Sequence, residues 1–226
     1  MQSDKSPPII RAVTSTLFEE NAYLVALEGG KQCVIVDPGL EPDPIIEVAG
    51  QLGWTPAAIL NTHGHADHIA GNQAMKNRWP ESPLLIGAGD ASKLTDPVGN
   101  LSAGFGVPLI SPPADRTVGE GEVLDLAGIK WTVLDTPGHS SGHVVFVAKQ
   151  LSPMIVLGGD VLFNGSIGRS DFPDSDPAAL IESIRVKLFT LPDDAIVLPG
   201  HGPGTTIGHE RRTNPFVGET ASQRTH

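Results

Sequence analysis

One short stretch of the chain concentrates groups that bind metal ions. Seven residues contain three imidazoles and a carboxylate: Thr62-His63-Gly64-His65-Ala66-Asp67-His68. Neutral imidazoles and carboxylates are the ligands of zinc and other first-row metals. The preceding apolar run, residues 57–60, predicts a buried strand, and residues that leave a strand at two-residue spacing point the same way. We therefore interpret His63, His65 and Asp67 as convergent ligands, because the alternative that Asp67 only caps the following helix leaves three histidines unexplained.

Three later strand ends supply further ligand types beside glycine. They are Thr136-Pro137-Gly138-His139, Gly158-Gly159-Asp160 and Pro199-Gly200-His201. Seven ligands are too many for one catalytic ion, which keeps a position open for water. We predict two divalent ions, with zinc as the leading candidate and iron or manganese as alternatives. One division of the ligands gives His63, His65 and His139 to the first ion, Asp67, His68 and His201 to the second, and Asp160 to both.

The predicted centre is suited to hydrolysis. Two divalent ions opposed by two carboxylates and one bridging hydroxide leave a net positive charge, which attracts an anion or a developing oxyanion. Paired ions also lower the pKa of a shared water and polarise a bound carbonyl.

Four other reactive residues have simpler interpretations. Glycine and proline around His143 predict a turn into a strand, so a structural role or a contact to a ligand is favoured over ligation. His209 lies in a polar stretch and is expected at the surface or as a cap. Asp37 is interpreted as a turn residue, with the orientation of a metal ligand as the alternative. Cys33 lies in an apolar strand and is expected to be an inert buried thiol.

Composition narrows the class of protein. The chain has 226 residues with 26 acidic and 15 basic side chains, a formal charge of −11, and no run of more than two Lys or Arg. Because the chain is acidic, we do not expect it to bind nucleic acid. The expected partner is a small-molecule substrate. The N-terminus lacks a signal pattern and no 18 consecutive residues are apolar, so neither a membrane partner nor export is expected. A single cysteine cannot form an internal disulfide, which agrees with a reducing compartment such as the cytoplasm. No sequence pattern indicates the oligomeric state.

The pattern of elements predicts an α/β fold. Apolar runs predict strands at residues 9–18, 21–28, 32–36, 57–60, 84–86, 122–126, 130–134, 144–147, 155–157 and 195–198. Helices are expected at 43–52, for about 11 residues after His68, and at 176–189. Two blocks of strands separated by helices indicate two sheets covered by helices in a single domain, 1–226, with a disordered tail from about Gly218. Residues 87–116 are interpreted as a pocket wall or as a surface loop.

With these four motifs in this order, the chain resembles the metallo-β-lactamase superfamily over nearly all its length. Within it, residues 160–169 and the stretch G-H-E-R-R-T-N-P-F are similar to the glyoxalase II (hydroxyacylglutathione hydrolase) group of short bacterial type. The resemblance implies a four-layer αββα sandwich of two mixed β-sheets and a binuclear site with the seven ligands above. It also implies hydrolysis of an S-acylglutathione thioester, such as the S-lactoylglutathione of methylglyoxal detoxification. A metal-bound hydroxide would attack the thioester carbonyl, with Asp67 orienting it as the catalytic residue.

Departures from that group concern the substrate. The full-length enzymes resemble the chain up to about residue 203 and continue into a helical domain that binds the glutathione carboxylates, which we do not expect here. Those enzymes have an aromatic residue two positions after the last histidine ligand, and in this chain Pro203 occupies that position. Their lysine after the G-x-G turn matches Arg169, the expected substrate-binding residue, which gains a bidentate donor.

Two other functions fit part of the pattern. A mononuclear-iron persulfide dioxygenase has a similar motif and a string like Gly168-Arg169-Ser170-Asp171-Phe172, but holds iron with two histidines and one aspartate. Residues 140–143 are closer to the thioesterase pattern. A metal-binding partner module without activity is the remaining alternative.

Overall fold

Two six-stranded mixed sheets and a small hairpin form the framework of the protein, seen in a computed structural model that describes residues 8–219 and 221. The first sheet has the order β1 (Pro8–Thr14), β2 (Asn21–Leu27), β3 (Gln32–Val36), β4 (Thr55–Asn61), β5 (Leu84–Gly87) and β6 (Arg116–Val118). The second has the order β14 (Thr205–Thr206), β13 (Ile196–Pro199), β10 (Ile155–Gly159), β9 (Val144–Ala148), β8 (Ile129–Asp135) and β7 (Val123–Leu126). Strands β3 to β6 are parallel, as are β10 and β13.

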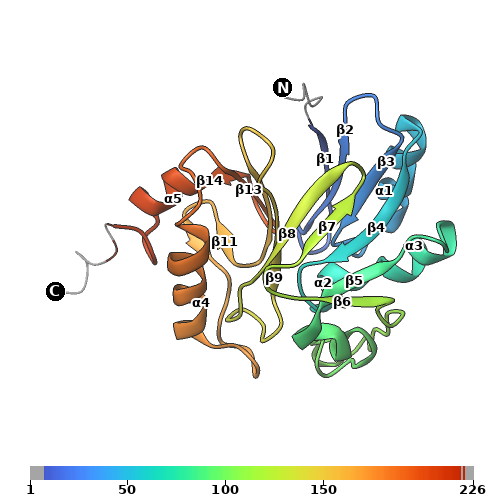
Figure 1. Ribbon diagram of the computed structural model, residues 1–226. Helices are drawn as coiled ribbons and strands as arrows, with labels where there is room; N and C mark the ends of the chain where they lie inside the picture. Colours follow the sequence, from blue (N-terminus) through green and yellow to red (C-terminus); the bar gives the residue numbers. More distant parts are fainter. Residues whose placement is uncertain (1–7, 220, 222–226) are drawn as a thin grey trace.

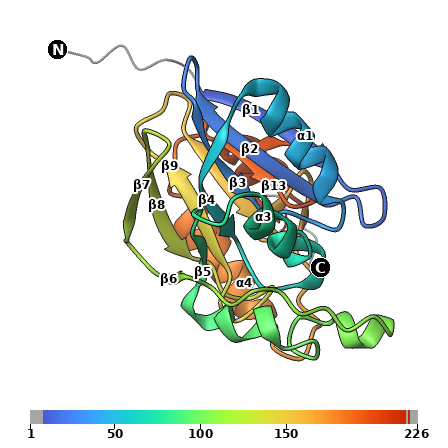
Figure 2. The ribbon, with the colours of Figure 1, turned by 90° about the vertical axis from the view of Figure 1, so that its right-hand side faces the viewer.

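Helices cover the outer face of each sheet (Figure 1). Helices α1 (Pro42–Leu52) and α3 (Asn72–Arg78) lie over the first sheet, as the rotated view also shows (Figure 2). Helix α4 (Pro177–Ser183), its π-helical continuation η3 (Ile184–Leu188) and α5 (Ile207–Thr213) lie on the second. The fold is therefore the four-layer αββα sandwich that the sequence predicts.

Apolar clusters fill the three spaces between these layers. Val34, Leu60, Trp131 and Phe146 belong to the cluster between the sheets. A second cluster joins the first sheet to α1 and α3, and a third joins the second sheet to α4, η3 and α5. The central strands are buried on both faces, which accounts for their continuous apolar runs. Cys33 is fully buried as expected, and burial raises the pKa of its thiol to about 12.

The four predicted ligand-bearing strand ends meet at one edge. Strands β4, β8, β10 and β13 end shortly before His63, His139, Asp160 and His201 respectively. The parallel pair β10 and β13 places Gly159 beside Pro199. Both sheets therefore deliver side chains to the same place.

The helix after the histidine motif starts earlier than predicted. Helix α2 (Ala66–Ile69) already contains Asp67, so Asp67 does not leave an extended segment together with the two preceding histidines. The turn forms because the amides of His68 and Ile69 donate to the carbonyl of His65. The helix then breaks, since Gly71 packs against the backbone of residues 38 and 39, and its amide donates to Pro38. The predicted helix of about 11 residues is therefore two shorter helices.

Two loops also differ from the prediction, and both reach the site. Strand β1 ends at Thr14, and the chain turns through Glu19 at φ 55°, so Leu17 and Phe18 leave the sheet. The segment 87–116 contains two 3-10 helices, η1 (Ala88–Thr95) and η2 (Ser102–Phe105), before β6.

The C-terminal stretch contains elements too short to give a periodic signal. A hairpin, β11 (Leu162–Phe163) and β12 (Ser166–Ile167), precedes Arg169, and α5 contains His209, which is exposed as expected. The buried Glu210 carboxylate accepts hydrogen bonds from Thr205, Gly165 and Asn214. The motif G-H-E-R-R-T-N thus fastens this hairpin to α5. The expected disordered tail falls largely outside the described residues, whereas Gly218 and Ala221 donate backbone hydrogen bonds.

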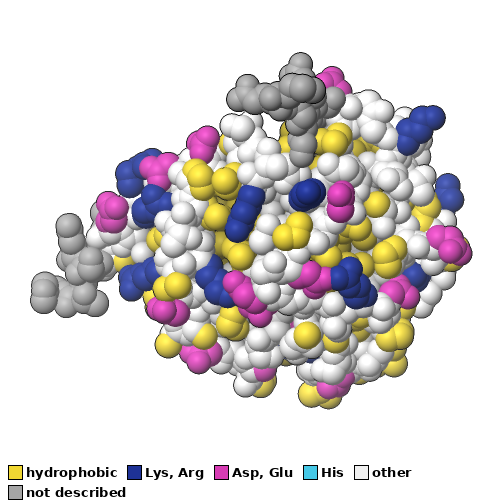
Figure 3. Space-filling view, in the orientation of Figure 1, with side chains coloured by type: hydrophobic (Ala, Val, Ile, Leu, Met, Phe, Trp, Pro, Cys, Tyr) yellow, Lys and Arg dark blue, Asp and Glu magenta, His cyan; other side chains and the backbone are white. Residues whose placement is uncertain are grey.

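The described surface is mixed in charge. On the face shown in Figure 3, acidic and basic side chains are interspersed. Among residues 8–219 and 221, no helix is long and apolar enough to cross a bilayer.

Candidate metal centre

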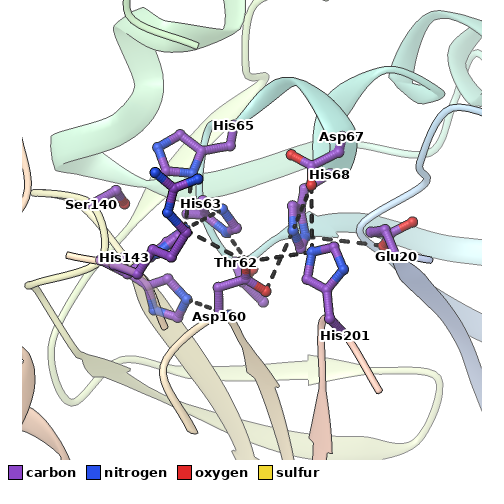
Figure 4. Close-up of polar contacts among 12 residues, drawn as sticks. Glu20, Thr62, His63, His65, Asp67, His68, Ser140, His143, Asp160 and His201 are labelled. Carbon is purple, nitrogen blue, oxygen red and sulfur yellow. Dashed lines mark hydrogen bonds and ion pairs between the residues drawn. The ribbon is translucent and has the colours of Figure 1, made fainter. Parts of the chain in front are cut away.

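Six of the predicted ligands form two groups that face each other across the strand ends (Figure 4). In the first group, His139 Nε2 lies 3.3 Å from His63 Nε2 and 2.9 Å from His65 Nδ1. In the second, Asp67 Oδ2 lies 3.8 Å from His68 Nε2 and 3.4 Å from His201 Nε2. First-row ions bind nitrogen at about 2.0 Å, which puts ligand atoms around one ion roughly 3.3 Å apart. Each group is therefore the size of one coordination sphere.

The seventh predicted ligand, Asp160, lies between the two groups. Its Oδ1 is 3.5 Å from His68 Nε2, and its Oδ2 is 3.6 Å from His139 Nε2 and 3.5 Å from His201 Nε2. The carboxylate thus faces both groups at once. Neighbouring positive charge outweighs the effect of burial and lowers the pKa of Asp160, with His68 as the largest contributor, so the group is ionised.

Hydrogen bonds on the far side of each ring determine which nitrogen carries the proton. His139 Nδ1 donates to the carbonyl of Arg169 at 2.7 Å, and His201 Nδ1 donates to the carbonyl of Phe18 at 3.1 Å. Thr62 Oγ1 donates to a carboxylate, so it accepts from His63 Nδ1 at 3.1 Å. The Nε2 atoms of these rings consequently carry unshared electron pairs that point into the centre.

These features fit metal ions. Two unshared pairs, on His63 and His139, point toward each other across 3.3 Å, an arrangement that a cation between them stabilises. His68 Nε2 and Asp160 Oδ1 are buried without a hydrogen-bond partner among the described residues. Burial lowers the pKa of His63 and lowers that of His65 to about 3, so both rings are neutral, as ligands must be. Burial would also lower the pKa of His68, but the neighbouring carboxylates of Asp160 and Asp67 raise it.

Asp37 has the role that the sequence interpretation ranked second. Its buried carboxylate accepts from Thr62 N at 2.8 Å, from Thr62 Oγ1 at 2.7 Å and from His68 Nδ1 at 3.1 Å. Asp37 also lies within reach of His63 and His68 as a third possible ligand group. Because both of its oxygens already accept hydrogen bonds, we assign it to orienting His68 and Thr62 rather than to ligation. The turn interpretation was incomplete, although its φ of 48° does place it in a turn conformation.

Two residues hold the ligand loops from behind. His143 is buried, and its Nε2 accepts from the backbone amide of Asp160 at 3.1 Å, a contact to a predicted ligand that agrees with the role favoured from the sequence. Asp90 is also buried and accepts from Gly64 N at 2.9 Å, Ser140 Oγ at 2.7 Å and Gly142 N at 2.8 Å. Asp90 therefore connects the loop that contains His63 and His65 to the loop that contains His139. The residues next to Asp90 in the sequence do not indicate this role.

The start of β2 holds the His201 loop. Asn21 Nδ2 donates to the carbonyls of Pro199 and Gly202 at 3.2 and 2.8 Å, and Tyr23 Oη donates to Pro199 at 2.8 Å. Glu20 pairs with His201 through the backbone, while its buried carboxyl lies 4.0 Å from His68 Nδ1. Burial raises the pKa of Glu20. The sequence feature that indicates contact with the His201 loop is the run of polar residues at the start of the strand, E-N-A-Y.

Two members of each ligand group line a pocket of about 570 Å³, together with Asp160: His65 and His139 of the first group and Asp67 and His201 of the second. Its walls come from the loop after β1, the 101–109 segment, the β11 strand and residues 169–172. Apolar lining residues predominate: Leu17, Phe18, Leu40, Ala66, Leu101, Phe105, Val107, Leu109, Phe163 and Phe172. The part of the 87–116 segment from Asn100 to Leu109 is thus a pocket wall.

Arg169 borders this pocket but is not free. Its side chain is 68% exposed and donates to Asp171 through Nε and Nη2, both at 3.0 Å. The guanidinium also lies 4.5 Å from the centre of the Phe172 ring. An anionic substrate would have to compete with the Asp171 carboxylate for this side chain.

Comparisons with known proteins agree with this geometry. The metallo-beta-lactamase superfamily model matches residues 15–201. The chain is 37% identical to the hydroxyacylglutathione hydrolase GloC of Haemophilus influenzae, over 92% of this chain and 97% of that protein. Among solved structures, the B3 metallo-beta-lactamase BLEG-1 superposes with a TM-score of 0.87 at 34% identity, covering 92% of this chain and 99% of the other. TTHA1623 in a di-iron-bound form has a TM-score of 0.79 at 38% identity, covering 91% and 99%.

Proposed function

The chain belongs to the metallo-beta-lactamase superfamily, and we propose that within it the protein is a metal-dependent hydrolase of S-acylglutathione thioesters such as S-lactoylglutathione. The observation that carries this proposal is the Asp160 carboxylate, which faces His68, His139 and His201 from between two complete ligand groups. The likeness to the hydroxyacylglutathione hydrolase over nearly the whole of both chains supports the thioester.

The cofactor we propose is a pair of divalent ions. His63, His65 and His139 would hold the first, and Asp67, His68 and His201 the second, with Asp160 shared. Zinc suits this set of nitrogen and carboxylate ligands, and iron, which a structural neighbour holds, is the alternative together with manganese. When bound, such ions lower the pKa of water and polarise a carbonyl oxygen.

The chain's own residues orient the reactants. Asp67 borders the pocket, and His68 keeps the pKa of its carboxyl below the usual value despite burial, so it is ionised. It can therefore accept a hydrogen bond from a water and aim the unshared pair of that water at the substrate carbonyl. Attack on the carbonyl carbon breaks the C–S bond, and the products are a carboxylic acid and a thiol.

Arg169 is the proposed contact for the anionic carrier. A guanidinium can bind a carboxylate of glutathione through two parallel hydrogen bonds. Its pairing with Asp171 weakens this contact, so we expect modest affinity for the carrier.

A dioxygenase would need only some of the converging side chains. A single iron held by two histidines and one aspartate would not use the convergence of Asp67, His68 and His201 within 4.8 Å of one another. A partner module without activity would have no use for a pocket that opens onto both groups.

One experiment separates these functions. Purified protein, loaded in turn with zinc, iron and manganese, is assayed for S-lactoylglutathione hydrolysis and for oxygen consumption with glutathione persulfide. The proposal expects thiol release without oxygen uptake. Oxygen uptake with iron alone would establish the dioxygenase, and inactivity of every metal form across a thioester panel would favour the partner module.

A further inference from the structure

The pocket over the ligand groups has two chemically different ends. At one end the Phe172 ring lies 5.1 Å from the His65 ring and 5.6 Å from the His139 ring, and the Arg169 guanidinium lies over Phe172. At the other end the Phe163 ring lies 6.2 Å from the His201 ring. The first end has the Arg169 guanidinium, which is paired with Asp171, and adjoins the first ligand group. The second adjoins His201.

The end beside His201 is walled by apolar side chains from two separate loops. The carbonyl of Phe18 accepts from His201 Nδ1 at 3.1 Å, so the loop after β1 is attached directly to a ligand. The Phe18 ring meets the edge of Phe105 with 5.7 Å between centres. Leu17 and Val107 extend this wall. Arg169 is the one Lys or Arg among the residues that line the pocket, and it lies over Phe172 at the other end.

Hydrogen bonds hold the 101–109 segment in place. Asn100, fully buried, donates to the carbonyls of Lys93 and Leu109 at 3.1 and 3.0 Å and accepts from Ser102 N at 3.0 Å. The carbonyl of Asn100 accepts from Ala66 N at 3.0 Å, which joins the segment to the start of α2. Leu101 adopts φ 71°, a conformation that leucine tolerates only where its surroundings impose it. The wall is therefore a constructed part of the site.

Three apolar side chains of the same wall are largely exposed. Leu17, Phe105 and Val107 are 70%, 67% and 72% exposed. Adjacent large apolar side chains at the mouth of a pocket gain free energy when an apolar ligand covers them. A lactoyl group is small and carries a hydroxyl, so it cannot provide this cover.

Resting on the proposed thioesterase function, we infer that the Phe18–Phe105 wall binds the acyl group of the substrate. The preferred substrates are then thioesters of aliphatic or aryl carboxylic acids rather than of a short hydroxy acid. The carrier thiol leaves toward Arg169. In the reaction, the water oxygen bonds to the acyl carbon, the C–S bond breaks, and the sulfur takes up a proton as the thiol is released.

The test compares acyl groups on one carrier. The metal-loaded protein is assayed with acetyl, lactoyl, butyryl and hexanoyl thioesters of glutathione. We expect kcat/KM to rise roughly fourfold per buried methylene, since each contributes a transfer free energy equivalent to that factor. Phe105→Ala should reduce kcat/KM for the hexanoyl thioester roughly tenfold or more and leave the acetyl thioester nearly unchanged. Val186→Ala, at an exposed apolar residue of η3 outside the pocket, should change neither.

Three results would overturn the inference. The first is a kcat/KM that does not change with acyl length. The second is an equal loss of kcat/KM for the acetyl and hexanoyl thioesters in Phe105→Ala. The third is a rate that depends on the length of the alkyl thiol in a series of acetyl thioesters. If no thioester is hydrolysed, the proposed function fails instead, and binding of the free acids decides the inference. Calorimetry should then show tighter binding of hexanoate than of lactate, weakened by Phe105→Ala, and equal binding of the two acids would overturn it.

Discussion

The Asp37 carboxylate lies 3.1 Å from His68 Nδ1, although 31 positions separate the two residues in the chain. This contact places the His68 proton on Nδ1 and leaves Nε2 facing Asp67 and Asp160. A proposed metal ligand is thereby oriented by a turn at the end of a neighbouring strand.

Replacing Asp37 should weaken metal binding more than folding. In Asp37→Asn the side chain keeps its shape, and asparagine tolerates the positive φ of 48°. The negative charge that polarises His68 is lost, so we expect roughly a tenfold to hundredfold weaker affinity for one ion. Competition with a chromogenic chelator measures this affinity. Asp125→Asn, at an exposed residue of β7, is the control and should bind both ions normally; an unchanged affinity in Asp37→Asn would remove Asp37 from the site.

Gly200 makes room for two of the proposed ligands, His68 and Asp160. A Cβ atom there would lie 2.6 Å from His68 Cε1 and would also overlap the Asp160 carboxylate. Gly200→Ala should therefore displace both side chains and lower the metal content, while Gly104→Ala, where the added methyl meets nothing within 4 Å, should not. Elemental analysis of the two variants checks this expectation, and a Gly200→Ala protein with full metal content would show that the ligands do not depend on this close packing.

Arg169 and Asp171 should act on substrate affinity in opposite directions. Arg169→Ala removes a charge-assisted contact that competes with Asp171, so we expect KM for S-lactoylglutathione to rise about tenfold with kcat little changed. Asp171→Asn frees the guanidinium and should lower KM a few fold. Steady-state kinetics measure both. Unchanged KM values in the two variants would exclude Arg169 from carrier binding.

Asp90 should make the metal-free fold sensitive to acid. Burial alone would raise its pKa, but Lys93 and the hydrogen bonds from Ser140 and Gly64 outweigh burial and lower it. A carboxyl with a lowered pKa stabilises the fold above its unfolded pKa, near 3.9, and this stabilisation is lost as the pH falls through the folded pKa. Asp90→Asn should therefore cost about 3 kcal/mol of unfolding free energy at pH 7.

Urea unfolding of chelator-treated protein between pH 3 and 7 measures this effect. The difference between wild type and Asp90→Asn should shrink below about pH 4. Asp125→Asn again serves as the control. A difference that stays constant with pH would mean that the Asp90 carboxylate charge does not support the fold.

Much of the fold follows from residue patterns because the central strands are buried on both faces and have continuous apolar runs. The seven proposed ligands were identifiable because they follow such runs and because three histidines and an aspartate within six residues, His63 to His68, are an unusual concentration of metal-binding groups. The four strand ends then meet in space as the strand order requires. Short elements such as β11 and β14 contain two residues each, too few to show a period.

The supporting residues were harder to identify because their partners are distant in the chain. Asp37 precedes Pro38 and Gly39, which is also the pattern of an ordinary turn, and its contact to His68 depends on the parallel pairing of β3 and β4. Asp90 lies in a weakly patterned segment, yet its partners are Gly64 and Ser140. The early start of α2 depends on the Ala66 amide meeting the Asn100 carbonyl, a tertiary contact.

Metal stoichiometry tests the binuclear centre most directly. Elemental analysis of wild type, Asp160→Ala and His201→Ala should give close to two transition-metal ions per chain in the wild type. His201→Ala should lose mainly one, and Asp160→Ala should lose metal together with activity, whereas His209→Ala should match the wild type. One ion per chain in fully loaded wild type, or two ions and normal turnover in Asp160→Ala, would contradict a centre in which Asp160 joins two ligand groups.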